Sequence, residues 1–248
     1  ERANPYSDEL ALQAQLAIFK RPALPTEDQL GFAYPPYALA AIFPLLFLPY
    51  DWAQAVWIAL LLLLLMLAGI TALPGARRWV LPSFLLFYPT FFGAILGNFA
   101  VLLSAGLLLF FGRFLSQSAP SRRAQIAFGL LAGWLTVKPQ FLWLYLLVIG
   151  LYALRKRLGW FFGGAAFSFA ACLAFSFALA PTWPADWLER LGKYTAYNQA
   201  YPVSTYLFNA LLPLQAAQIL TLLLIGLALP LSAYLLWRWW RGALAGLP

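Results

Sequence analysis

The stretch Phe32-Ala33-Tyr34-Pro35-Pro36-Tyr37 separates a polar N-terminal segment from a chain that is almost entirely apolar. Two consecutive prolines fix φ and remove two backbone donors, so the stretch is stiff and suits the start of a helix better than its interior. Downstream, apolar runs are long enough to enter a membrane. Upstream, residues 1–34 hold five of the eight acidic residues, which are Glu1, Asp8, Glu9, Glu27 and Asp28.

The composition is that of a membrane protein. Of 248 residues, 63% are hydrophobic and only 10% are charged, whereas soluble domains are about half apolar and a quarter charged. The net charge of +8 sits in short basic clusters between apolar runs, which is typical of cytoplasmic loops and does not indicate nucleic acid. The sequence therefore predicts an all-α polytopic transmembrane helical bundle with membrane lipids, and no nucleic acid, as partners.

Missing residue types narrow the chemistry. The chain has no histidine, which removes histidine-based catalysis and the commonest zinc ligand. Cys172 stands alone in an apolar run. We therefore expect it to be a small core residue that forms neither a disulfide nor a thiolate metal site. We expect no metal and no cofactor.

Residues 1–34 predict an extracytoplasmic arm with a short interfacial helix. Ser7 is suited to cap a helix that begins at Asp8 and Glu9, because carboxylates are favourable at a helix N-terminus. Apolar residues then recur at helical spacing, at Leu12, Leu16 and Phe19.

Residues 35–241 predict the transmembrane bundle, with about seven to nine membrane helices by length. Residues 35–48 are too short for a comfortable span and predict a re-entrant or interfacial segment. Residues 181–206 predict an extracytoplasmic loop. The expected helices cover residues 52–73, 79–96, 99–111, 124–152 with a break at Lys138-Pro139-Gln140, 159–180 and 213–237.

The distribution of basic residues predicts the topology. Cytoplasmic loops carry the excess of Lys and Arg, so the clusters in residues 77–78, 113–123, 155–157 and 238–241 are expected on the cytoplasmic side. Gly97-Asn98 and Lys138-Pro139-Gln140 are then the tips of two helical hairpins on the opposite side. We expect the functional site at that extracytoplasmic face.

Lys138 is the sharpest single indication of function. An ionisable residue within apolar sequence is energetically expensive and points to a functional site, and a lysine is a suitable point charge for a phosphate. The alternative is a side chain that snorkels to the interface. Asn98, at the other tip, is a second polar candidate, although Gly97-Asn98 also fits a simple tight turn.

The remaining candidates each have an ordinary structural explanation, which for Asp8 and Glu9 is the favoured one. Asp8 and Glu9 are adjacent carboxylates that could supply a general base, or they are helix N-terminal charges. Tyr197 and Asn198 combine a ring face with hydrogen-bonding groups, which suits a sugar or a lipid headgroup, but equally an aromatic interface belt.

Several short motifs occur in a familiar order: Asn4-Pro5-Tyr6, Phe32-Ala33-Tyr34-Pro35-Pro36, Pro44-Leu45, Leu48-Pro49 and Trp57. This order resembles that of the polyprenol-phosphate-dependent mannosyltransferases of glycosyltransferase family 87, multi-pass membrane enzymes of the GT-C type. Gly97-Asn98 sits where that family often has Gly-Gln-x-Asn, and residues 129–139 resemble a later segment with Gly, Leu and Lys. The resemblance covers most of residues 4–145.

The resemblance implies transfer of a sugar, in this family mannose, from a polyprenyl-phosphate donor to a hydroxyl of a lipid or glycan acceptor. The reaction would occur on the extracytoplasmic face of a bacterial plasma membrane without a metal. Lys138 and Asn98 would hold the donor phosphate, and apolar grooves the prenyl chain. Sugar or acceptor would be positioned by Tyr34, Gln140, Tyr197 and Asn198.

The sequence departs from the family pattern at two places. Asn98 replaces the glutamine, and Ala100 stands where the second polar residue would be. The family's catalytic aspartate lies shortly before the segment matched by Asn4-Pro5-Tyr6, which would place it upstream of Glu1. We therefore expect a fragment of a longer protein, in which Asp8 and Glu9 are substitute bases at best.

Two other functions compete with the transferase. A transporter or lipid flippase also uses broken helices with polar tips, but here the polar positions are expected at one face and the halves show no inverted repeat. A scaffold subunit would explain the bundle but not Lys138.

Overall fold

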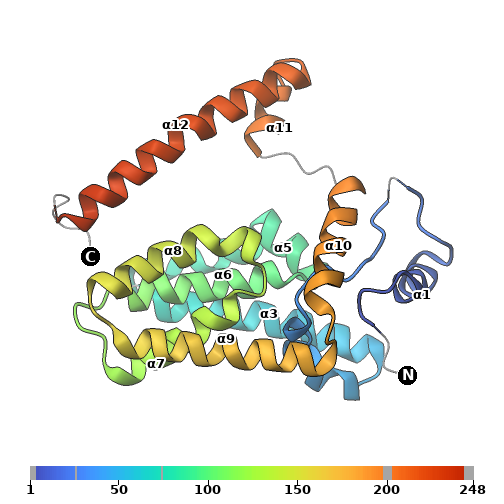
Figure 1. Cartoon of the computed structure of the whole chain (residues 1–248), viewed down its shortest axis with the longest axis horizontal. Coiled ribbons are helices and arrows are strands. Elements are labelled where there is room, and N and C mark those ends of the chain that lie inside the picture. Colours follow the sequence, from blue (N-terminus) through green and yellow to red (C-terminus); the bar gives the residue numbers. More distant parts are fainter. Residues whose placement is uncertain (1–3, 26, 74, 198–202, 243–248) are drawn as a thin grey trace. The chain divides into compact units, whose positions relative to one another are not determined.

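A computed structural model describes residues 4–25, 27–73, 75–197 and 203–242. The regular elements in these ranges are helices (Figure 1), so the expected all-α fold of a membrane protein is confirmed. Contacts divide the chain into two units, one formed by residues 34–187 and the other by residues 1–33 with 188–247. Each unit is described by itself.

The unit of residues 34–187 contains most of the apolar helices. It begins with three short helical pieces and continues with a long helix, three short helices and four further helices. In chain order these are η1 Pro36–Ala38, α2 Leu39–Ile42, η2 Phe43–Phe47, α3 Tyr50–Ala72, η3 Gly75–Val80, α4 Leu81–Leu86, α5 Tyr88–Ile95, α6 Phe99–Leu109 continued by the π-helical turn η4 Phe110–Phe114, α7 Arg122–Leu135, α8 Pro139–Arg155 and α9 Gly159–Leu179.

Among the described residues, three helices have the length and apolar composition to cross a membrane: α3, α9 and, in the other unit, α12 (Leu214–Trp240). Shorter apolar helices lie at residues 36–47, 99–114 and 142–155. The helix expected at residues 79–96 is divided into α4 and α5, and Pro82 and Pro89 each lie in the first turn of one of them. The segment of residues 35–48 contains three short helical pieces. Its re-entrant or interfacial position and the total number of membrane helices stay predictions.

Helices α7 and α9 pack with their backbones in contact (Figure 1). A Cβ added to Gly129 would lie 2.2 Å from the Phe161 carbonyl oxygen, and one added to Gly164 would lie 2.7 Å from the Ile126 carbonyl oxygen. Small residues allow this close approach, which is how apolar helices associate where lipid removes the hydrophobic driving force.

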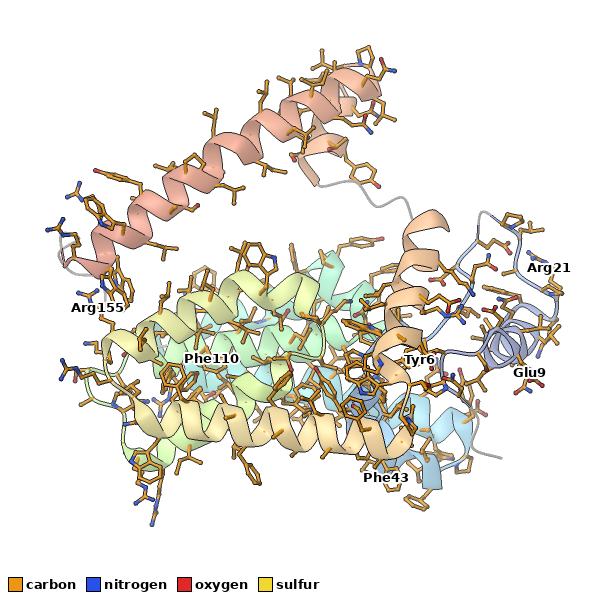
Figure 2. All side chains as sticks on the ribbon, in the orientation of Figure 1. Tyr6, Glu9, Arg21, Phe43, Phe110 and Arg155 are labelled. Atoms are coloured by element: carbon orange, nitrogen blue, oxygen red, sulfur yellow. The ribbon has the colours of Figure 1, made fainter. Side chains whose placement is uncertain are left out.

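Phenylalanine rings fill the space beside this contact. Phe110 and Phe114 have no exposed surface, and their ring centroids lie 5.1 and 4.7 Å from that of Phe128 on α7. Phe114 also stacks on Phe161 of α9 at 5.5 Å. This cluster fixes the end of α6 against the α7–α9 pair (Figure 2, Phe110).

The other unit contains α1 (Asp8–Phe19) and α12, with α11 (Val203–Asn209) packed on α12. The predicted start of α1 is confirmed, because the Ser7 hydroxyl accepts a hydrogen bond from the Leu10 amide at the helix N-terminus. Residues after α1 fold back onto it. The buried Gln15 amide donates to the Gln29 carbonyl and accepts from the Ala23 amide, both at 2.8 Å.

The loop predicted at residues 181–206 is partly helical, since it contains α10 (Trp183–Tyr197) and the start of α11. The sequence analysis did not predict α10, because polar and aromatic residues are mixed within it. An ion pair at i,i+4 between Glu189 and Lys193, 3.0 Å long, supports the helix. The extracytoplasmic position of this segment stays a prediction, as does that of the arm.

Candidate functional site

Residues 34–37, which we call the Pro-Pro stretch, form a rigid turn at one end of the unit of residues 34–187. Pro36 occupies the first position of η1, as its fixed φ predicts. The Tyr37 amide donates to the hydroxyl of buried Ser176 near the end of α9, at 3.1 Å. The Tyr37 hydroxyl lies 2.9 Å from the Thr136 hydroxyl, which donates to the Gly133 carbonyl at 2.6 Å. Two helix ends therefore hold this turn.

Gly97 and Asn98 form the first hairpin tip through backbone geometry. Gly97 has φ +61°, and the bonds from the Gly97 amide to the Ala94 carbonyl and from the Asn98 amide to the Gly93 carbonyl close a Schellman motif. The Asn98 side chain then caps α6 by accepting from the Ala100 amide at 2.9 Å. These bonds account for both residues as a tight turn, and a role for Asn98 in binding phosphate stays a prediction.

Lys138 lies at the second hairpin tip, directly before Pro139 at the start of α8. Its side chain is half-buried, and Nζ lies 5.4 Å from the centre of the Tyr34 ring, within the range of a cation–π contact. The predicted break between α7 and α8 is therefore present, and it places the ammonium beside the Pro-Pro stretch.

An aromatic junction brings the two tips and the Pro-Pro stretch together. Phe99, the residue after Asn98, has its ring centroid 5.1 Å from that of Tyr34, 5.4 Å from that of Trp57 and 6.5 Å from that of Trp134. The Trp57 indole donates to the Gly97 carbonyl at 2.9 Å. The structure therefore gathers Tyr34, the tip at Asn98 and the tip at Lys138 at one end of this unit.

An apolar groove begins at the same junction. It has a volume of about 330 Å³, and Trp57, Gly97 and Phe99 form the part of its lining that belongs to the junction. The rest of the lining comes mainly from η2 and α3, with Gln54 and Tyr50 as its polar members. A groove of this kind suits an apolar chain whose polar end lies at the junction.

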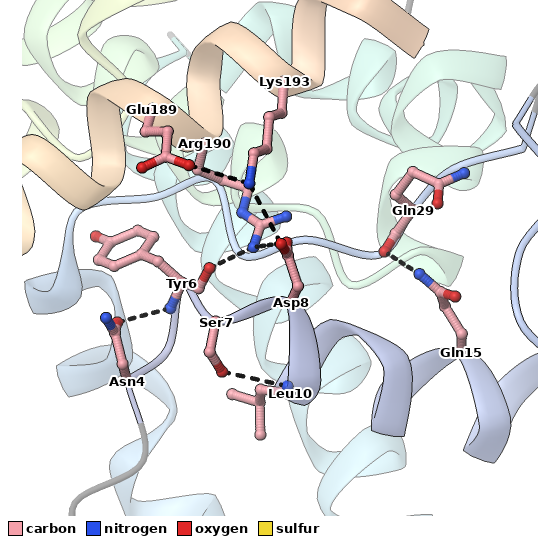
Figure 3. A network of polar contacts seen from close by, with 10 residues as sticks. All are labelled: Asn4, Tyr6, Ser7, Asp8, Leu10, Gln15, Gln29, Glu189, Arg190 and Lys193. Atoms are coloured by element: carbon pink, nitrogen blue, oxygen red, sulfur yellow. Dashed lines mark hydrogen bonds and ion pairs between the residues drawn. The ribbon is translucent and has the colours of Figure 1, made fainter.

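In the unit of residues 1–33 and 188–247, the Asp8 side chain contacts two cationic side chains, those of Arg190 and Lys193 (Figure 3). Its carboxylate accepts from Arg190 at 2.9 Å and from Lys193 at 3.3 Å. The hydrogen bond from Lys193 is the main cause that holds the pKa of Asp8 below its ordinary value of 3.8, with Arg190 acting in the same direction against desolvation. A carboxylate with a lowered pKa is a weaker base, so this geometry favours the structural role of Asp8.

Arg190 is the polar residue that sequence reasoning missed. Its side chain is 5% exposed, and its guanidinium donates to Asp8 and to the Tyr6 carbonyl. Gly31 provides the room, because a Cβ there would lie 2.9 Å from Arg190 Cδ. No local pattern marks an arginine whose partners are more than 180 residues away.

The other predicted site residues are less informative. Glu9 is exposed on α1. Gln140 lies in the first turn of α8 and Tyr197 ends α10, but both side chains fall outside the described part of the chain, as does all of Asn198. Their roles stay predictions.

Comparison with known proteins identifies a family. The sequence model of glycosyltransferase family 87 matches residues 32–247, a range that includes Tyr34, Asn98 and Lys138 but begins after Asp8 and Glu9. No curated protein and no solved structure matches the chain.

Proposed function

The chain belongs to glycosyltransferase family 87 and is a membrane glycosyltransferase, and we propose that its donor is a polyprenyl-phosphate sugar and its sugar is mannose. The acceptor is a hydroxyl of a lipid or glycan at the extracytoplasmic face of a bacterial plasma membrane. The observation that carries the proposal is the position of Lys138, whose ammonium lies over Tyr34 at the junction where an apolar groove begins.

The groove and the ammonium match the two halves of such a donor. A polyprenyl chain is apolar and would lie in the groove beside Trp57 and Phe99, while the phosphate would lie next to Lys138. A half-buried ammonium interacts more strongly with a phosphate than one in bulk water, because the local dielectric is lower. Tyr34 would then present its ring to the sugar or acceptor, with Gln140 following one residue after Pro139.

The proposed reaction is a displacement at the anomeric carbon. The acceptor oxygen forms a bond to that carbon as the bond from the carbon to the phosphate oxygen breaks, and the acceptor proton passes to a base. The departing phosphate gains negative charge in the transition state. Lys138 would stabilise this charge more than it stabilises the bound donor, which is the condition for lowering the barrier.

The donor class can be tested directly. Membranes that contain the protein should transfer labelled mannose from polyprenyl-phosphate mannose and not from a nucleotide-linked mannose, with membranes lacking the protein as the control. Transfer from the nucleotide-linked sugar alone would overturn the donor. Absence of transfer from every lipid-linked sugar, together with movement of the lipid across the membrane, would favour a flippase instead.

The two acidic candidates can be tested as the base. We expect Asp8→Asn and Glu9→Gln each to keep transfer within about threefold of the wild type, because loss of a general base lowers rates by about 100-fold or more and Asp8 is engaged by two cations. Arg190→Met is the matched control, because it removes the ion pair between Arg190 and Asp8 while leaving the Asp8 carboxylate in place. A 100-fold loss in Asp8→Asn but not in Arg190→Met would identify Asp8 as the base.

A further inference from the structure

Six basic residues gather at the end of the unit of residues 34–187 where α6 ends and α7 begins. We call them the basic rim: Arg113, Arg122, Arg123, Arg155, Lys156 and Arg157. They come from η4, the start of α7, the end of α8 and the two residues after it. The Tyr152 hydroxyl donates to the Gln117 carbonyl at 2.9 Å, and the Phe114 ring lies 5.9 Å from Tyr152. These contacts join the end of α8 to η4 and to the connection that follows it. Figure 2 labels Arg155 at this end of α8.

The part of the sequence that forms the basic rim contains no acidic residue. The sequence contains no aspartate or glutamate between Asp51 and Asp186, which includes every element that forms the rim. An excess of positive charge on one surface produces a field that attracts anions from outside the protein. The partner is therefore expected to be anionic.

An aromatic side chain is built into the rim. The Arg122 guanidinium carbon lies 3.6 Å from the centre of the Trp160 ring, and Trp160 is 49% exposed. A guanidinium on a ring face keeps its N–H donors, because they lie in its own plane. Arginine and tryptophan in this arrangement provide donors for an oxyanion and, beside them, the amphipathic ring that prefers the headgroup region of a bilayer.

Exposed apolar side chains lie next to the rim along the chain. The side chains of Phe111, Leu154 and Phe162 are all more than 40% exposed. Each lies one or two positions along the sequence from Arg113, Arg155 or Trp160, respectively. Cationic donors directly beside apolar surface match a molecule whose anionic group is attached to hydrocarbon. A nucleic acid or an acidic peptide would leave this apolar surface without a partner.

We propose that the basic rim binds the headgroup of an anionic phospholipid, with the phosphate at Arg122 and Arg157 and the acyl chains on the apolar surface beside them. Juxtamembrane basic residues attract anionic lipids by about 1 kcal/mol each, which is about fivefold in affinity. The site lies away from the aromatic junction, so it does not depend on the proposed donor or reaction.

The test compares two lipids on the purified protein in detergent. Phosphatidylglycerol and phosphatidylcholine with the same acyl chains are added in equal amounts, and the retained lipid is counted by native mass spectrometry. The wild type should retain phosphatidylglycerol preferentially. The triple variant Arg122→Gln/Lys156→Gln/Arg157→Gln should lose that preference by roughly 100-fold, at about fivefold for each charge.

The control keeps the change in net charge the same but places it elsewhere. Lys20→Gln/Arg21→Gln/Lys193→Gln removes three charges from the other unit, where Arg21 and Lys193 are paired with acids, and should keep the preference. Trp160→Leu should weaken it while leaving the charge unchanged. Equal retention of the two lipids by the wild type, or an equal loss in both triple variants, would overturn the proposal.

Discussion

Lys138→Met should lower sugar transfer by about 100-fold or more while leaving the protein folded. Removing one preorganised group that stabilises developing negative charge typically costs this much in rate, and methionine keeps most of the volume of lysine without its charge. The expected cause is loss of stabilisation of the departing phosphate, because Nζ lies at the junction of Tyr34 and the apolar groove. The measurement is initial-rate transfer from polyprenyl-phosphate mannose in membranes with matched expression.

Two further variants separate this role from a general effect of losing a lysine. Lys20→Met removes an exposed ammonium that donates to the Ala17 carbonyl on α1, and it should transfer at the wild-type rate. Lys138→Arg keeps the charge and should retain part of the activity, since a guanidinium has a different shape and hydration. Transfer that survives in Lys138→Met would return Lys138 to a snorkelling side chain stacked on Tyr34.

Gly129→Ala should destabilise the bundle by about 3 kcal/mol, toward the upper end for overpacking in a well-packed core. The added methyl would lie 2.2 Å from the Phe161 carbonyl oxygen and 2.9 Å from the Ala165 amide nitrogen. Both neighbours belong to the backbone of α9, so neither can move without separating the two helices. Thermal unfolding of the detergent-solubilised protein should therefore begin at a clearly lower temperature than in the wild type.

Two adjacent glycines of α9 provide the matched comparison. A Cβ at Gly164 would lie 2.7 Å from the Ile126 carbonyl oxygen, whereas a Cβ at Gly163 meets nothing within 4 Å. Gly163→Ala should be neutral or slightly stabilising, because alanine favours the helix, while Gly164→Ala should follow Gly129→Ala. Equal melting temperatures for the two α9 variants would show that the α7–α9 contact is looser than described.

The sequence predicted the features that depend on neighbouring residues. Ser7 caps α1, Pro139 begins α8, and Gly97-Asn98 reverses the chain, as expected. Each of these depends on backbone dihedrals or on donors within a few residues, which local composition controls. The same reasoning predicted a break at Lys138, because an ionisable residue followed by proline seldom continues an apolar helix.

Features that depend on distant residues were predicted only in part. The sequence and the family resemblance assigned Tyr34, Asn98 and Lys138 to one site, but not the ring contact between Tyr34 and Phe99 or the position of Lys138 over Tyr34. The burial of Arg190 was missed, because it depends on Tyr6, Asp8 and Gly31. The order of α10 was missed for a different reason, since a helix that mixes aromatic and charged residues lacks the simple apolar period of a membrane span.

The hydrogen bonds from Tyr37 through Thr136 to Gly133 all donate in one direction, which determines whether they could carry a proton. Thr136 has one hydroxyl hydrogen, which it donates to the Gly133 carbonyl, so Tyr37 must be the donor to Thr136. A proton wire needs a terminal group that can hold the proton, and a peptide carbonyl does not. This chain of hydroxyls therefore anchors the turn and offers no terminal group that could take up a proton.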